Sequence, residues 1–171
     1  RMARDFRNSI KALSVIDICP TLDMYESTNM YFAKKYFHWF FLIQPKGIPE
    51  KMIESNPKMW LKHCLNKWST GYDFSSIENK YLESFKKPER IHASCEDYRA
   101  AATIDLKHDR ADKDKLLEIP IQVLWGKHGI IGKIFSPISL WQRYSKINVQ
   151  GKEINSGHFI PEEKPEETIK E

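Results

Sequence analysis

The sequence predicts an α/β fold in which a long all-helical segment interrupts a parallel β-sheet. Three observations support this prediction. Residues 12–18 form a short apolar, β-branched run typical of a buried parallel strand, residues 22–115 have the pattern of successive helices, and strand-like and helix-like runs alternate again from residue 116. Because a segment of this length is too long for an ordinary loop, we expect a core in residues 1–21 and 116–171, and a helical cap in residues 22–115.

The composition excludes two classes of partner. A hydrophobic content of 41% and a charged content of 29% are ordinary for a globular protein, and no apolar run reaches the roughly 20 residues that cross a bilayer. The net charge of +4 comes from scattered residues, without the basic and aromatic block typical of nucleic-acid binding. We therefore expect no membrane partner and no nucleic-acid partner.

Three cysteines, Cys19, Cys64 and Cys95, are odd in number and far apart in the chain. This spacing indicates neither a disulfide framework nor a zinc knuckle. A reducing, cytoplasmic location is the simplest expectation, and we expect no metal and no cofactor.

The first strand predicted is residues 12–18, and Pro20 ends it because proline removes a ladder donor and restricts the residue before it. Asp17 therefore lies at the carboxyl end of a strand, where open α/β sheets place their ligands. The alternative is that Asp17 only caps a turn.

The cap is expected to consist of several helices. Ser27 or Thr28 can cap a run dense in aromatic residues that reaches residue 42, and Asn56 before Pro57 is typical of a helix start. The further segments expected are helices at 59–68, 75–85 and 88–103 and a charged linker at 105–114.

The last part of the chain returns to the α/β pattern. Strands are predicted at 119–126 and 148–154, with a helix at 136–144 between them and a closing helix from Pro161. The turn Ser156-Gly157-His158 follows the last strand and precedes this closing helix. A histidine in that place suits a catalytic base of a hydrolase, and the alternative is that it caps the helix.

The order of the motifs resembles the fluoroacetate and haloacetate dehalogenases of the α/β-hydrolase fold. The matching segments are VIDICPT at 15–21, FHWFF at 37–41, SCEDYRA at 94–100 with TID at 103–105, LWG at 124–126 and SGHF at 156–159. The His-Trp pair and the Asp-Tyr-Arg segment are the most specific of these. The resemblance implies a partial α/β-hydrolase core of three C-terminal strands with flanking helices, interrupted by an all-helical cap.

The resemblance also implies a mechanism and its residues. In such enzymes an aspartate displaces halide from the α-carbon of a haloacetate, and a histidine-activated water hydrolyses the resulting ester. His158 corresponds to the general base, Asp17 to the acid that orients it, and His38, Trp39 and Tyr98 to the halide-binding donors. For the last three, ordinary aromatic packing is the alternative.

The choice of Asp17 agrees with the loop at 126–132. Many α/β hydrolases place the orienting acid in this loop, but here it reads GKHGIIG and contains no carboxylate. The substrate implied is a small halogenated carboxylate, and a homodimer of the full-length protein is left open.

The chain departs from the family at the nucleophile. The family's Asp-Arg-Gly motif is absent, and no Gly-x-Ser-x-Gly or Gly-x-Asp-x-Gly elbow occurs. Because Arg1-Met2-Ala3 resembles the helix just after that elbow, we expect the chain to begin downstream of its nucleophile and these 171 residues to be inactive by themselves. The alternatives are an epoxide hydrolase of the same fold, in which Tyr98 would polarise the epoxide oxygen, and a non-catalytic hydrolase-like binding protein.

Overall fold

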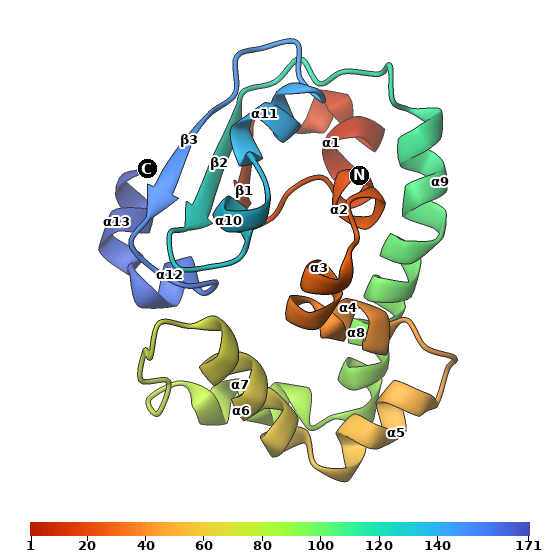
Figure 1. The fold of residues 1–171 in the computed structure, drawn as a ribbon, viewed down its shortest axis with the longest axis vertical. Helices are drawn as coiled ribbons and strands as arrows, with labels where there is room; N and C mark the ends of the chain where they lie inside the picture. The colour runs from red at the N-terminus through yellow and green to blue at the C-terminus, as the bar shows by residue number, and fades with distance from the viewer. The chain divides into compact units, whose positions relative to one another are not determined.

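The computed structural model describes all residues from 1 to 171. They form two compact units (Figure 1). The first, the sheet unit, combines Arg1–Ser27 with Asp105–Glu171, and the second, the helical unit, is Thr28–Ile104. None of the helices has both the length and the apolar character needed to cross a lipid bilayer.

The sheet unit is built on three parallel strands: β1 (Leu13–Ile16), β2 (Ile121–Gly126) and β3 (Gln150–Ile154). Their order is β1-β2-β3, so β2 lies between the other two (Figure 1). The predicted parallel sheet is therefore confirmed. Because the strands are parallel, their carboxyl ends meet at one edge.

The middle strand β2 is buried on both faces. Val123, fully buried, packs in a cluster with Val15 and Val149, while the next residue, Leu124, packs with Ile154 and Ile160 in a separate cluster. Successive side chains of a strand point to opposite faces. The continuous apolar run of this strand is thus explained by a core on each side of the sheet.

Short helices complete the sheet unit: α1 (Met2–Asp5), the 3₁₀ turn η1 (Arg7–Ser9), α2 (Thr21–Glu26), α9 (Ile104–Ala111), α10 (Ile131–Ile134), α11 (Pro137–Gln142), α12 (Ile160–Glu163) and α13 (Pro165–Lys170). The charged segment expected as a linker at 105–114 is mostly the helix α9, so that expectation is wrong. Its Asp109 forms ion pairs with Arg1 and Arg4, each at 3.2 Å, which stabilise the segment as a helix.

The helix α2 is also anchored within the sheet unit. The buried Asp23 accepts hydrogen bonds from Arg143 at 2.6 Å and from the Tyr144 hydroxyl at 2.5 Å. The sequence predicts a cap over residues 22–115, whereas these contacts and those of α9 join residues 22–27 and 105–112 to the sheet unit.

The helical unit contains α3 (Met30–Lys35), α4 (Phe37–Leu42), α5 (Ile48–Ser55), α6 (Pro57–Trp68), α7 (Glu78–Phe85) and α8 (Pro88–Ala102). The run expected from Ser27 or Thr28 is instead capped by Asn29, whose side chain accepts a hydrogen bond from the Phe32 N–H, and it breaks at Tyr36. The start at Asn56 is confirmed, since its side chain accepts from the Met59 N–H. The core of this unit includes Leu42, Ile53, Ile91 and Cys95.

Candidate active site

Asp17 and His158 are 141 residues apart in the sequence and form a hydrogen bond in the sheet unit. Asp17 follows the last residue of β1, and His158 lies in the turn after β3. The distance from His158 Nδ1 to Asp17 Oδ2 is 2.7 Å. The Asp17 side chain is 2% exposed and the His158 side chain 42%, so the acid is buried while the imidazole reaches solvent.

The pair meets across the end of the middle strand, because β2 lies between β1 and β3. Gly126, the last residue of β2, makes this possible. A Cβ atom on Gly126 would lie 1.9 Å from the carbonyl oxygen of Gly157, in the turn that carries His158. The Gly126 N–H also donates a hydrogen bond of 2.9 Å to Asp17 Oδ1. A glycine at this point therefore allows the histidine turn to lie directly against the strand end.

The backbone of Asp17 has a left-handed conformation, with φ of 51°. Such a conformation costs an L-residue about 1 kcal/mol or more, although Asp and Asn tolerate it better than most residues. The Asp17 N–H still continues the sheet ladder by donating to the Leu124 carbonyl at 2.7 Å. Strained residues of this kind occur frequently at functional sites.

The hydrogen bond to Asp17 fixes the chemistry of the His158 ring. An ionised carboxylate can only accept hydrogen bonds, so Nδ1 of His158 carries the proton. In the neutral imidazole, Nε2 is then unprotonated and can take a proton from water. This arrangement of acid and imidazole is the one that general-base catalysis requires.

Glu163, in α12, contacts the histidine turn and is a residue that the sequence analysis did not single out. Its carboxylate accepts hydrogen bonds from the N–H groups of Gly157 and Phe159, at 3.0 and 3.3 Å. Phe159 is the N-cap of α12, so Glu163 is the fourth residue of the helix, one position beyond the one from which the acid of a capping box reaches back. The sequence therefore holds no standard capping signal that could have identified Glu163.

The remaining predicted site residues lie together in the helical unit. His38 and Trp39, on α4, are each 6% exposed. Their ring centroids lie 5.8 Å and 6.3 Å from that of Tyr98, on α8. The structure thus groups all three rings, and the same contacts are compatible with aromatic packing.

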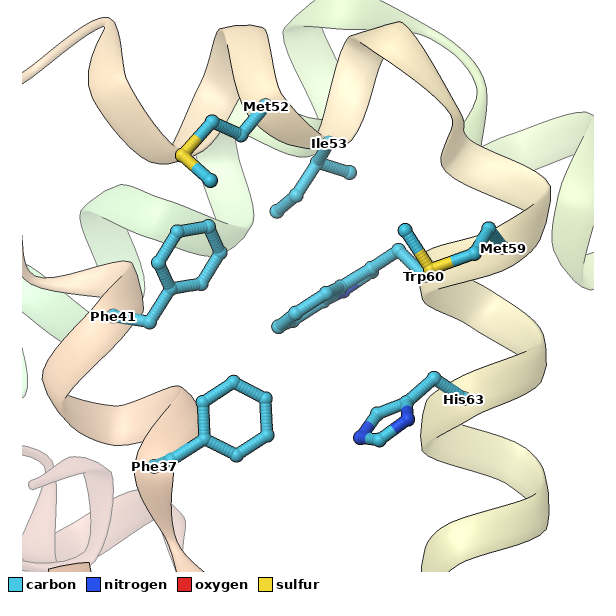
Figure 2. A pocket seen from close by; sticks show the side chains of 7 residues that line it. All are labelled: Phe37, Phe41, Met52, Ile53, Met59, Trp60 and His63. Carbon is cyan, nitrogen blue, oxygen red and sulfur yellow. The ribbon is translucent and has the colours of Figure 1, made fainter.

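The opposite face of α4 lines an apolar pocket of about 310 Å³ in the same unit (Figure 2). The rings of Phe37 and Phe41 lie 6.1 and 5.3 Å from that of Trp60. The full lining is Phe37, Phe41, Met52, Ile53, Met59, Trp60 and His63. None of the predicted site residues lines this pocket.

A cluster of Glu50, His92 and Glu96 places three ligand atoms within 4.8 Å of one another, as a metal site would. Arg99 already binds these acids, with its Nη1 at 2.7 Å from Glu50 and 2.6 Å from Glu96. The hydrogen bond from Arg99 lowers the pKa of Glu50 to about 2, against the opposing effect of burial. The cluster is therefore an ion-pair network around a guanidinium, and the acids have little capacity left for a cation.

The cysteines do not supply a nucleophile. Burial raises the pKa of Cys19 to about 12, with further contributions from Asp17 and Asp23. Burial likewise raises the pKa of Cys64 to about 12 and that of Cys95 to about 11. The thiolate is the reactive form of cysteine, so these thiols are unreactive near neutral pH.

Comparison with known proteins shows that the chain is similar to hydrolases. No protein-family model matches the chain. It is similar to fluoroacetate dehalogenase from Burkholderia sp, with 34% identity over 174 residues that cover 99% of this chain and 57% of that protein. It is also similar to the soluble epoxide hydrolase from Corynebacterium sp. (strain C12), with 28% identity over 98% of this chain and 58% of that protein.

Among solved structures, a protein from Nostoc sp PCC 7120 that is described as an alpha/beta hydrolase has a TM-score of 0.94 and 46% identity. The match covers 99% of this chain and 59% of that one. The chain therefore spans less than two thirds of the length of these proteins. The α/β-hydrolase fold and the resemblance to the fluoroacetate dehalogenases, both predicted from the motifs, are confirmed.

Proposed function

Because this chain has the α/β-hydrolase fold and resembles the fluoroacetate dehalogenases, we propose that it is part of a hydrolase that cleaves the carbon–halogen bond of short haloacids. His158 is the general base of this reaction and Asp17 is the acid that orients it. The observation that supports these roles best is the 2.7 Å hydrogen bond between His158 Nδ1 and the buried Asp17 carboxylate.

In the mechanism that the resemblance to the dehalogenases implies, the reaction has two steps. A carboxylate nucleophile outside these 171 residues attacks the α-carbon, an ester C–O bond forms, and the halide leaves with the electron pair of the broken bond. Water then loses a proton to Nε2 of His158 and attacks the ester carbonyl carbon. The bond between the ester carbonyl carbon and the substrate oxygen breaks, and the departing alkoxide takes the proton from His158 and leaves as the hydroxyacid. The nucleophile, now a carboxylic acid, loses one proton to solvent and is regenerated as a carboxylate. Without that nucleophile, the 171 residues alone do not complete the reaction.

His38, Trp39 and Tyr98 are the halide-binding donors in this proposal. Imidazole and indole N–H groups and a phenolic O–H are all hydrogen-bond donors, and donors aimed at a leaving anion stabilise the charge that develops in the transition state. In the helical unit the Tyr98 ring contacts those of both His38 and Trp39, which supports their acting as a group.

Halide release by the full-length protein tests the proposal. We expect repeated turnover with fluoroacetate and chloroacetate for the wild type. His158→Asn leaves the ester without an activated water, so at most one halide per protein is released and mass spectrometry detects the ester adduct. His108→Asn changes an exposed histidine of α9 and is the matched control. No halide from the wild type with either acid, and no difference between the wild type and His158→Asn, would mean that the proposal is wrong.

The second candidate function is epoxide hydrolysis, because a soluble epoxide hydrolase is among the relatives. It uses the same base and acid, with Tyr98 polarising the epoxide oxygen. Diol formation from a simple epoxide, in the absence of halide release from haloacids, would favour this function over the first.

A further inference from the structure

The turn that carries His158 is held by a carboxylate from the segment that follows it. Glu163 Oε2 accepts a hydrogen bond of 3.0 Å from the Gly157 N–H, and Oε1 accepts one of 3.3 Å from the Phe159 N–H. These two amides stand immediately before and after His158. One side chain therefore binds the backbone on both sides of the histidine.

Glu166 offers a comparison for this contact. Glu163, at the end of the short helix α12 (Ile160–Glu163), is partly buried and accepts hydrogen bonds from both amides, whereas Glu166, on α13, is exposed. Amides at a helix start have no partner within the helix, and a charged acceptor binds them more strongly than a neutral one.

The opposite side of the turn is fixed by the strand end. The Gly157 carbonyl lies so close to Gly126 that a Cβ atom there would come within 1.9 Å of its oxygen. The peptide groups around His158 are thus held by Gly126 on one side and by Glu163 on the other. The direction of the imidazole toward Asp17 depends on the position of those peptide groups.

We propose that Glu163 is a positioning residue that acts through His158. Glu163 holds the backbone on both sides of His158, so that Nδ1 of the imidazole faces Asp17 and Nε2 faces the reacting water. The proposal rests on the proposed role of His158 as general base. In this role Glu163 acts only through the backbone of the turn, and a misplacement of about 1 Å at a reacting group can lower a rate by about 10²-fold.

The variants that test this are Glu163→Ala, which removes both acceptors, and Glu163→Gln, which keeps the shape. Glutamine has one acceptor oxygen, and its NH₂ group then faces the second amide donor. We therefore expect an intermediate effect from Gln and a larger one from Ala. Glu166→Gln removes the same charge from an exposed site of the neighbouring helix and is the matched control.

Two measurements on the full-length protein separate positioning from a general loss of structure. In NMR spectra, the wild type should show the downfield proton of the Nδ1–H group bound to Asp17, and Glu163→Ala should lose it while circular dichroism remains unchanged. In kinetics with fluoroacetate, Glu163→Ala should lower kcat by about 10- to 100-fold with KM within threefold. Glu166→Gln should change neither.

The two proposals fail in different ways. If the wild type releases no halide, the proposed function is wrong, while the NMR signal still tests Glu163. If Glu163→Ala retains the Nδ1–H signal and a kcat within twofold of Glu166→Gln, the positioning role is wrong. If Glu163→Ala does not fold, Glu163→Gln decides: an unchanged signal and unchanged kcat overturn the proposal, and a partial loss of both supports it.

Discussion

Replacing Asp17 with asparagine should reverse the proton arrangement of the His158 ring. The Asp17 carboxylate accepts hydrogen bonds on both oxygens, from Gly126 N–H on Oδ1 and from His158 Nδ1–H on Oδ2. Asparagine has one acceptor and one donor group. Its oxygen must stay on the Gly126 amide, so its NH₂ group faces Nδ1 of His158, and the imidazole proton moves to Nε2.

Two contributions set the size of the effect. To keep the active tautomer, the amide must turn its NH₂ group toward the buried Gly126 N–H, which leaves that donor unsatisfied at about 1–3 kcal/mol. The second contribution is the lost carboxylate charge, which is hydrogen-bonded to the ring that becomes positive. Two charges whose centres are about 4 Å apart interact with about 4 kcal/mol at an effective dielectric constant near 20. Roughly half of that applies here, because the His158 side chain is 42% exposed. The two contributions add to about 3–5 kcal/mol, so the attack of water on the ester should be about 10²- to 10⁴-fold slower in Asp17→Asn.

The assay combines halide release by the full-length protein with nitrogen chemical shifts of His158, which distinguish Nδ1–H from Nε2–H. Asp23→Asn is the control, because Asp23 is also buried but binds Arg143 and Tyr144. If Asp17→Asn keeps the Nδ1–H tautomer and releases halide within threefold of the wild type, the reasoning about the pair is refuted.

Two further changes test the framework of each unit. Gly126→Ala would place a methyl 1.9 Å from the Gly157 oxygen, so we expect a loss of about 2–4 kcal/mol in unfolding free energy and a lower Tm. Gly71→Ala, where φ is 84° with no atom within 4 Å, should cost only about 1 kcal/mol, and equal losses would contradict the argument. Glu50→Gln removes a carboxylate whose pKa is lowered from 4.5 to about 2 by Arg99. Because the folded-state pKa is the lower one, its contribution of about 3 kcal/mol is present above pH 4.5 and is lost as the pH falls through 2. The unfolding free energies of the wild type and Glu50→Gln, measured with urea, should therefore differ at pH 6 and converge toward pH 2. A difference that stays constant with pH would show that ionisation of Glu50 does not stabilise the fold.

The first two strands of the core could be predicted because each is an apolar run, ended by Pro20 in β1 and by Gly126 in β2. Local composition was enough for β2 in particular, since a strand buried on both faces has few polar residues. The third strand, β3, is mostly polar and exposed, so its composition is a weaker signal. The ends of the helices were harder to predict from the sequence. The break at Tyr36 and the helix α9 depend on which side chain reaches which partner, and α9 is held by Arg1 and Arg4 from the other end of the chain.

The candidate site was predictable to different degrees. Parallel strands predict that Asp17 and His158 lie at the same edge, and the structure places them 2.7 Å apart. Their catalytic roles stay predictions. The close approach at Gly126 could not be foreseen, because it depends on two backbone segments that are distant in the sequence. His38, Trp39 and Tyr98 came from the resemblance alone, since an aromatic helix has the same pattern whether it packs or binds a ligand.

The separation of 141 residues between Asp17 and His158 has a consequence for biosynthesis. A chain emerges from the ribosome at about 5–20 residues per second, and N-terminal segments fold first. Asp17 therefore emerges on the order of ten seconds before His158. The whole helical unit, Thr28–Ile104, is contiguous and is synthesised in that interval. The pairing of β1 with β2 and the contact between Asp17 and His158 therefore form only after the whole helical unit has been synthesised.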